Sequence, residues 1–189
     1  MKLDYRGPLT TGQKRTTKIV VNTLFLLLTK NNFDSITVRE ICKLSLIPHS
    51  TFYNYFEDKY DVYKWACFSR FNEIYPNPDA SMNHYENIPG MIDPIYDFLD
   101  ENKTLFRKIA RHNPRNETLF NLTRQCLADY TEIVFRHCTS GVDYEVPIEV
   151  VFDTYVDGMF SIFVQTIYGG KNYTREQVRN YLTKLYNRQ

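Results

Sequence analysis

Glycine and proline are scarce in this sequence of 189 residues, which contains seven of the first and eight of the second. Their scarcity excludes a collagen-like chain and a linker-rich architecture. An excess of charge of one sign is also missing, because 23 Lys+Arg oppose 22 Asp+Glu and leave a formal net charge of +1. A hydrophobic share of 43% excludes an intrinsically disordered chain. The composition is therefore that of one folded domain, or of two small ones.

A long hydrophobic run is absent as well. The most apolar segment, residues 159–167, is interrupted by Ser161, Gln165 and Thr166, and it falls short of the ~18–20 apolar residues of a membrane span. The first twelve residues are polar and carry no secretory signal. We therefore expect a cytoplasmic protein with no membrane partner.

Cysteine is infrequent and shows no paired spacing; the four residues are Cys42, Cys67, Cys126 and Cys138. We expect these thiols to be reduced and mostly buried. A zinc site is conceivable, but no Cys-x2-Cys or His-x3-His spacing supports it. The residues that could form such a site are His112, Cys126, His137 and Cys138. We therefore expect no metal and no cofactor.

Apolar residues recur at helical spacing rather than in alternation, which predicts an all-α fold. Val20, Leu24, Leu27 and Leu28 mark the buried face of a first helix. A short second helix begins with the capping box Thr37–Glu40, and Val38, Ile41 and Leu44 are expected to form its apolar face. A second capping box, Thr174–Gln177, marks the start of the last helix. The helices expected are 16–30, a short one from 37 that Leu46-Ile47-Pro48 interrupts, 48–55, 59–75, 91–112, 117–137, 147–168 and 175–187, with a long polar loop at 76–90.

The two short helices within residues 37–55, joined by a tight turn, form a helix-turn-helix pattern. Except for Pro48 and Phe52, every residue of the second helix has a hydrogen-bonding side chain. The first carboxylate after the start of this helix is Glu57, beyond its end. A helix that lies in the major groove needs such a surface, because base edges are read by hydrogen bonds. The pattern therefore predicts DNA binding.

This segment resembles the DNA-binding domain of the TetR family of bacterial transcriptional regulators over about residues 14–62. The resemblance lies in Ile36-Thr37-Val38, Ile41, Thr51-Phe52-Tyr53, Tyr55-Phe56 and Asp58-Lys59-Tyr60. Two positions depart from the family pattern. Leu46 stands where a turn glycine is common, and Pro48 stands where a serine usually caps the recognition helix.

The resemblance implies roles for individual side chains. Phosphate contacts are expected from Thr37, Thr51, Tyr53 and Lys59, with flanking contacts from Lys14, Arg15 and Lys18. Base edges are expected to be read by His49, Ser50 and Asn54, with Tyr55 on a phosphate or a thymine methyl group. Each of these side chains could instead be an ordinary solvated or partly packed surface residue.

Charge is unevenly distributed along the chain. Residues 1–64 contain ten Lys+Arg and six Asp+Glu, a net charge of +4, whereas residues 65–189 contain thirteen and sixteen, a net charge of −3. The basic part is the part with the helix-turn-helix pattern, as attraction to phosphate requires. We therefore expect a DNA-binding domain at residues 1–58 and a helical domain for effector binding and dimerisation at 59–189.

The resemblance also implies uses for the second domain. The last two helices, 147–168 and 175–187, would form a homodimer interface, and the first of them is apolar on more than one side. An ordinary buried helix in a monomer is the alternative. A small-molecule effector would bind in the middle of the chain, where the candidate lining residues are Trp65, Phe68, Tyr96, Phe106, Arg107, Arg111 and Phe120.

The sequence thus predicts a homodimeric transcriptional regulator, in the first place a repressor, that binds a palindromic double-stranded operator and is switched by an effector. A co-regulator that acts through protein contacts of its C-terminal domain is the main alternative. An enzyme is disfavoured, because the sequence has no Gly-rich phosphate loop, Gly-x-Ser-x-Gly motif or paired carboxylates, and we expect no catalytic residues.

Overall fold

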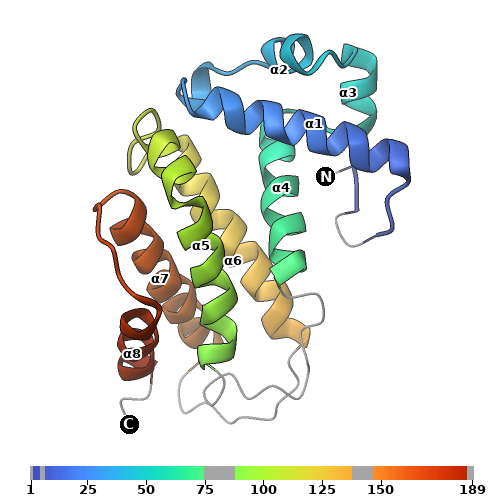
Figure 1. Ribbon diagram of the computed structural model, residues 1–189. Helices are drawn as coiled ribbons and strands as arrows, with labels where there is room; N and C mark the ends of the chain where they lie inside the picture. The colour runs from blue at the N-terminus through green and yellow to red at the C-terminus, as the bar shows by residue number, and fades with distance from the viewer. Residues whose placement is uncertain (1, 5–6, 75–87, 138–146, 187–189) are drawn as a thin grey trace. The chain divides into compact units, whose positions relative to one another are not determined.

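The computed structural model describes residues 2–4, 7–74, 88–137 and 147–186, and within these ranges the chain is helical with no strand. The all-α prediction is confirmed. The expected loop at 76–90 lies outside the described residues as far as residue 87, and α5 already begins at Ile88. The elements are α1 Thr11–Leu28, the 3₁₀ turn η1 Phe33–Ser35, α2 Val38–Ser45, α3 His49–Tyr55, α4 Lys59–Ile74, α5 Ile88–Ala110, α6 Thr118–His137, α7 Ile148–Ile167 and α8 Arg175–Tyr186 (Figure 1).

Side-chain capping boxes set the starts of α1, α2 and α8. Both predicted capping boxes are present: Glu40 N donates to Thr37 Oγ1 over 3.2 Å, and Gln177 N donates to Thr174 Oγ1 over the same distance. The predicted start of α1 at Thr16 is wrong. A third capping box, Thr10–Gln13, starts this helix at Thr11, and Thr10 N donates to Gln13 Oε1 over 2.8 Å.

The turn between α2 and α3 is made by a leucine in a glycine-like conformation. Leu46 has φ 56° and ψ 32°, in the left-handed region where a Cβ atom is unfavourable. Its side chain is 89% exposed, so packing does not offset the strain. Pro48 follows as the N-cap of α3 and provides no side-chain cap. The turn keeps its helix-turn-helix geometry without the family glycine.

The chain divides into two compact units, described here separately. Unit 1 comprises residues 1–73 and 108–126, and unit 2 comprises 74–107 and 127–189. Unit 1 thus contains most of α4 and the turn between α5 and α6 together with the helix-turn-helix, whereas the boundary predicted from the sequence lies at residue 58. That functional boundary stays a prediction.

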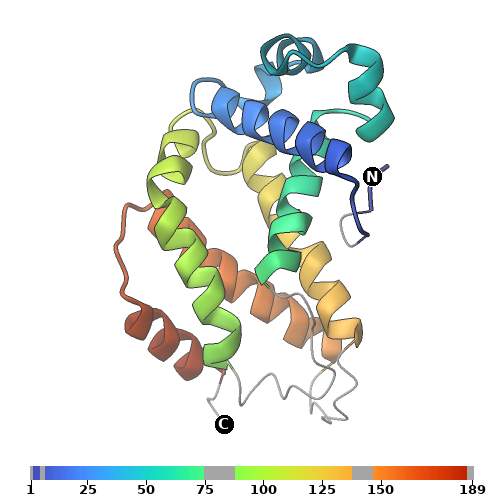
Figure 2. The ribbon, with the colours of Figure 1, turned by 45° about the vertical axis from the view of Figure 1, so that its right-hand side comes forward.

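The core of unit 1 is built from α1, η1 and the two short helices. Figures 1 and 2 show α1 running beside α2 and α3, with α4 leading away from them. The expected apolar face of α2 needs one correction. Leu44 is 55% exposed, and Cys42 and Ser45 are buried beside Ile41 instead, because these three fall on one side of a helix with 3.6 residues per turn. The largest fully buried hydrophobic side chains in this unit are Phe33, Phe52, Phe56, Leu24, Leu28 and Ile41.

In unit 2, α8 packs against α5 and α7 of the same chain. Val178 and Leu182 are buried against Tyr96, Ile162 and Tyr173. Two ion pairs fasten the same helix to α5, Arg179 with Asp93 and Arg175 with Asp97. The hydrogen bond from Arg179 lowers the pKa of Asp93 below its ordinary value. Figure 2 shows α8 beside the first turns of α5.

Helix α7 is long and apolar enough to span a membrane by length and composition alone, over residues 149–167. The core helix of a globular protein passes the same test, so this is weak evidence for a membrane. The helix contributes buried side chains to unit 2: Val151, Tyr155, Val156, Phe160, Val164 and Ile167. Its other side is exposed and mostly polar, with Asp153, Thr154 and Asp157.

The described cysteines are free thiols. Cys42 and Cys126 are buried, as expected, and Cys67 is partly exposed. A hydrogen bond with Cys126, followed by burial, raises the pKa of Cys67 well above its ordinary value. The thiol therefore stays protonated and weakly nucleophilic. Cys138 and the side chain of His137, two members of the conceivable zinc site, lie outside the described residues.

The substitution Leu46→Gly should stabilise the protein. Glycine removes the strain of the left-handed conformation, and the loss of an 89% exposed side chain costs little packing. We expect a gain in unfolding free energy of about 0.5 kcal/mol, measured by urea denaturation. The control Leu44→Gly, at an exposed position inside α2, should lower it by about 0.5–1 kcal/mol. A loss of stability in both variants would contradict the strain at Leu46.

Candidate nucleic-acid interface

The short helix α3 presents two different faces. Phe52 is fully buried and anchors the helix to the core of unit 1. On the opposite side, four polar or amphipathic side chains are exposed and fall into two pairs at i, i+4 spacing: His49 with Tyr53, and Ser50 with Asn54. The rings of His49 and Tyr53 lie 6.4 Å apart between centroids. Thr51 and Tyr55, also predicted to contact DNA, are partly exposed at the sides of this face.

The start of α2, the second predicted phosphate-binding element, is occupied by its own capping box. Thr37 Oγ1 donates to Glu40 Oε2 over 2.8 Å, and Thr37 N donates to the same oxygen over 2.8 Å. The backbone hydrogen bond from Thr37, followed by the side-chain bond, lowers the pKa of Glu40 below its ordinary value. A phosphate at this site would therefore meet an ionised carboxylate, and the phosphate contact of Thr37 stays a prediction.

Two exposed cations on α2 were not among the residues predicted from the sequence. Arg39 and Lys43 are separated by four residues, so they lie on the same side of the helix. Their i, i+4 spacing is a signal in the sequence that predicts two cations on one face of this helix. On α1, the predicted flanking cations Lys14, Arg15 and Lys18 are all exposed.

The N-terminal segment reaches the far end of α3. Lys2 Nζ donates to Tyr53 O over 2.7 Å, across 51 residues of sequence. A cation is favourable near the C-terminal end of a helix, because the last carbonyl groups have no partners within the helix. Lys2 is not among the residues predicted from the sequence to contact DNA.

Lys59, the last predicted phosphate ligand, is engaged within unit 1. Its ammonium group donates to the carbonyl oxygens of Phe33, Asp34 and Ile36 over 2.8, 3.0 and 2.9 Å. These carbonyls belong to η1 and the residue that follows it. The segment at residues 31–36, which we call the α1–α2 linker, leads directly into Thr37 and α2.

Asn113, fully buried in the turn between α5 and α6, holds the same linker. Its Oδ1 accepts from Phe33 N over 2.7 Å, and its Nδ2 donates to Asn31 O over 3.2 Å and to Ile109 O over 3.0 Å. At the edge, Thr118 Oγ1 donates to Asp34 Oδ2 over 2.8 Å. Five backbone groups of the linker thus have partners from distant parts of unit 1: Phe33 N and the carbonyls of Asn31, Phe33, Asp34 and Ile36.

The residues predicted to bind an effector are divided between the two units. Trp65, Phe68, Arg111 and Phe120 belong to unit 1, where Phe68 and Phe120 are buried and Arg111 is exposed. The Nε1–H of Trp65 is buried and has no hydrogen-bond partner among the described residues. An unpaired buried donor costs about 1–3 kcal/mol, which a ligand acceptor would recover.

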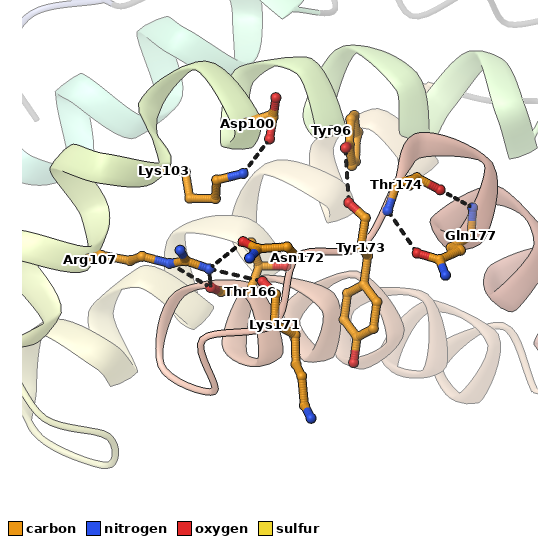
Figure 3. A network of polar contacts seen from close by, with 10 residues as sticks. All are labelled: Tyr96, Asp100, Lys103, Arg107, Thr166, Lys171, Asn172, Tyr173, Thr174 and Gln177. Carbon is orange, nitrogen blue, oxygen red and sulfur yellow. Dashed lines mark hydrogen bonds and ion pairs between the residues drawn. The ribbon is translucent and has the colours of Figure 1, made fainter.

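Unit 2 contains the other three predicted residues, Tyr96, Phe106 and Arg107, on α5. Phe106 packs against Phe98 and Phe163 in edge-to-face geometry. The guanidinium of Arg107 donates to Thr166 O, Lys171 O and Asn172 Oδ1, at 2.9 Å for the shortest contact with each, and so fastens the segment between α7 and α8 (Figure 3). Tyr96 Oη donates to Tyr173 O over 2.9 Å on the same segment.

A small cavity lies between α5, α7 and α8. Its lining is mostly apolar, with Tyr96 among the lining residues and Asp100, Lys103 and Asn172 as polar ones. Its volume is ≈ 30 Å³, about the volume that one molecule occupies in liquid water. Ligand pockets measure about 300–1,000 Å³, so an effector fits here only if these helices move apart. The effector site stays a prediction.

Known proteins share this arrangement of helices. A Syntrophomonas wolfei protein assigned to the TetR family of transcriptional regulators has 18% sequence identity and a TM-score of 0.64, with 92% of this chain and 93% of that chain covered. DhaS, a dihydroxyacetone kinase operon activator, has 20% identity and a TM-score of 0.55, with coverage of 90% and 93%. No family model and no curated protein matches the sequence. The chain therefore has a TetR-like fold, all-α with an N-terminal helix-turn-helix and a C-terminal helical region.

The substitution Asn113→Ala should destabilise unit 1. It leaves the buried N–H of Phe33 and the carbonyl of Asn31 without their partner, which we expect to lower the unfolding free energy by about 2–3 kcal/mol. Denaturant unfolding measures the effect. The control Asn121→Ala removes an exposed asparagine whose bond to Asn116 O is local, and it should change stability by less than about 0.5 kcal/mol. Equal effects of the two substitutions would contradict the role given to Asn113.

Proposed function

We propose that this chain is a DNA-binding transcriptional regulator that works in the cytoplasm and binds a palindromic operator as a homodimer. The exposed face of α3 is the single observation that carries the proposal. A helix anchored by one buried phenylalanine and otherwise covered with hydrogen-bonding groups, without a carboxylate, suits the major groove. The +4 charge of residues 1–64 supports the same conclusion, because it would attract phosphate.

The proposed contacts fall into two classes. Base edges are read by His49, Ser50 and Asn54, while phosphates are contacted by the exposed cations of α1 and by side chains at the ends of α2 and α3. Contacts of the first class give sequence preference, and those of the second position the protein on the duplex. The proposed phosphate contacts are Lys14, Arg15, Thr37, Thr51, Tyr53 and Tyr55, of which Tyr55 could instead meet a thymine methyl group.

The proposed homodimer uses α7 and α8. Among the described residues of unit 2, the large hydrophobic side chains that are clearly exposed all lie on these two helices: Val150, Tyr181 and Leu185. Val150 and Leu185 line a shallow groove with Asp153, Asp157 and Gly158. Two-fold symmetry would place two α3 helices on half-sites about 34–36 Å apart, which one helix-turn-helix cannot read alone.

Regulation by a small-molecule effector is part of the proposal, in the first place as release of a repressor. The indole N–H of Trp65, which has no hydrogen-bond partner within the described ranges, supports a ligand near α4. The ≈ 30 Å³ cavity of unit 2 favours the second candidate function, a co-regulator whose C-terminal helices dock another protein. A reporter gene behind the selected operator, assayed with and without the chain, distinguishes repression from activation.

Selection of DNA from a random library should yield an inverted repeat for the wild-type chain. The variant Asn54→Ala should lose preference at one position in each half-site, by about 1–3 kcal/mol per base pair, because a bidentate contact is lost. The control Asn22→Ala, at an exposed position on α1, should keep the wild-type preference. Weak and sequence-independent binding of the wild-type chain would overturn the proposed function.

The double variant Val150→Glu, Leu185→Glu should be monomeric in sedimentation equilibrium at concentrations where the wild-type chain is a dimer. In a two-fold interface each new carboxylate is present in both subunits, and both copies would be buried without a positively charged partner. The control Leu26→Glu introduces one carboxylate at a leucine of α1 that is 55% exposed, and it should leave the dimer intact. A dimeric double variant would exclude this face as the interface.

A further inference from the structure

The ammonium group of Lys59 has no hydrogen to spare for a phosphate. A lysine ammonium carries three N–H donors, and the structure directs three hydrogen bonds from Nζ to Phe33 O, Asp34 O and Ile36 O, over 2.8–3.0 Å. A contact with DNA would have to replace at least one of them. The replaced carbonyl would then lose a charge-assisted hydrogen bond.

Two aromatic rings lie beside the same nitrogen. Nζ lies 4.8 Å from the centroid of the Phe33 ring and 5.6 Å from that of the Tyr60 ring, so the cation faces two π-systems. The two rings are themselves packed edge to face, with centroids 5.0 Å apart. Burial accordingly lowers the pKa of Lys59 from its ordinary value, against the opposing effect of Asp34 and Asp58.

The position of Lys59 gives these contacts a consequence for DNA binding. It is the first residue of α4, with three residues between it and the end of α3, whereas its partners belong to the linker that leads into α2. One side chain therefore connects the residues that follow α3 with the linker that precedes α2. Asn113 and Thr118 hold the same linker through other atoms, Phe33 N and the Asp34 carboxylate.

We propose that Lys59 is a positioning residue for DNA binding: through the carbonyls of Phe33, Asp34 and Ile36 it fixes the α1–α2 linker, and it does not contact phosphate. This inference rests on the proposed function and revises the role that the family resemblance implies for this lysine. Its loss moves α2 and α3 relative to each other but removes no cation from the DNA interface.

The salt dependence of operator binding separates the two roles. Each phosphate neutralised by a cation contributes about 0.9 to the slope of log K against log salt concentration. A phosphate-binding lysine present twice in a homodimer would contribute about 1.8. For Lys59→Met we expect weaker binding at every salt concentration with the wild-type slope. A slope that falls by about 1.8 would overturn the proposal.

A measurement on the wild-type chain covers the case in which Lys59→Met does not fold. Reductive methylation followed by mass spectrometry reports how accessible each lysine amine is. We expect Lys59 to react more slowly than the exposed Lys14 and Lys43 in the free protein, and at the same rate after the operator is added. A fast reaction in the free protein, with protection by DNA alone, would overturn the proposal.

The outcomes distinguish this inference from the function on which it rests. If the wild-type chain selects no DNA sequence, the proposed function fails, and slow methylation of Lys59 in the free protein still upholds its contacts with the linker. If the chain selects an operator but Lys59→Met lowers the salt slope, the function stands and the positioning role fails.

Discussion

The arrangement of the helix-turn-helix depends on how the backbone of residues 31–36 is satisfied. The one short 3₁₀ turn of this linker pairs only part of its backbone, and Phe33 N and the carbonyls of Asn31, Asp34 and Ile36 bond to side chains outside it. Lys59 supplies donors to three of its carbonyls, and Asn113 accepts from Phe33 N and donates to Asn31 O. Because α2 begins directly after the linker, the positions of α2 and of the α3 that follows it depend on these bonds.

Unit 2 uses the same solution at the segment between α7 and α8. Arg107 donates to Thr166 O in the last turn of α7 and to Lys171 O and Asn172 Oδ1 of the segment, and Tyr96 donates to Tyr173 O. The ion pairs between α5 and α8 add a second attachment, with Arg179 and Arg175 partly exposed, so each pair contributes little by itself. In both units, long side chains from one helix hold an irregular segment that precedes another helix. A change in such a segment would therefore move the helix after it.

Features governed by nearest neighbours could be predicted from the sequence. The capping boxes at Thr37 and Thr174 and the polar face of α3 each depend on a few adjacent residues. The errors have local causes too: the Thr10–Gln13 box was present and not used, and the apolar face of α2 was assigned to Leu44 rather than to Cys42 and Ser45. A helix of eight residues offers too few positions to fix its buried side by periodicity.

The sequence by itself determined the helical class, most helix starts, the basic character of residues 1–64 and the side chains that α3 presents to solvent, because propensity, capping and charge act over a few residues. Only the tertiary structure decided what Lys59, Asn113 and Arg107 do. Their partners lie 23–26 residues away for Lys59, up to 82 for Asn113 and up to 65 for Arg107. No local pattern records such a distance, because the same side chains would be compatible with a solvated surface until the fold brings a backbone carbonyl within hydrogen-bonding distance.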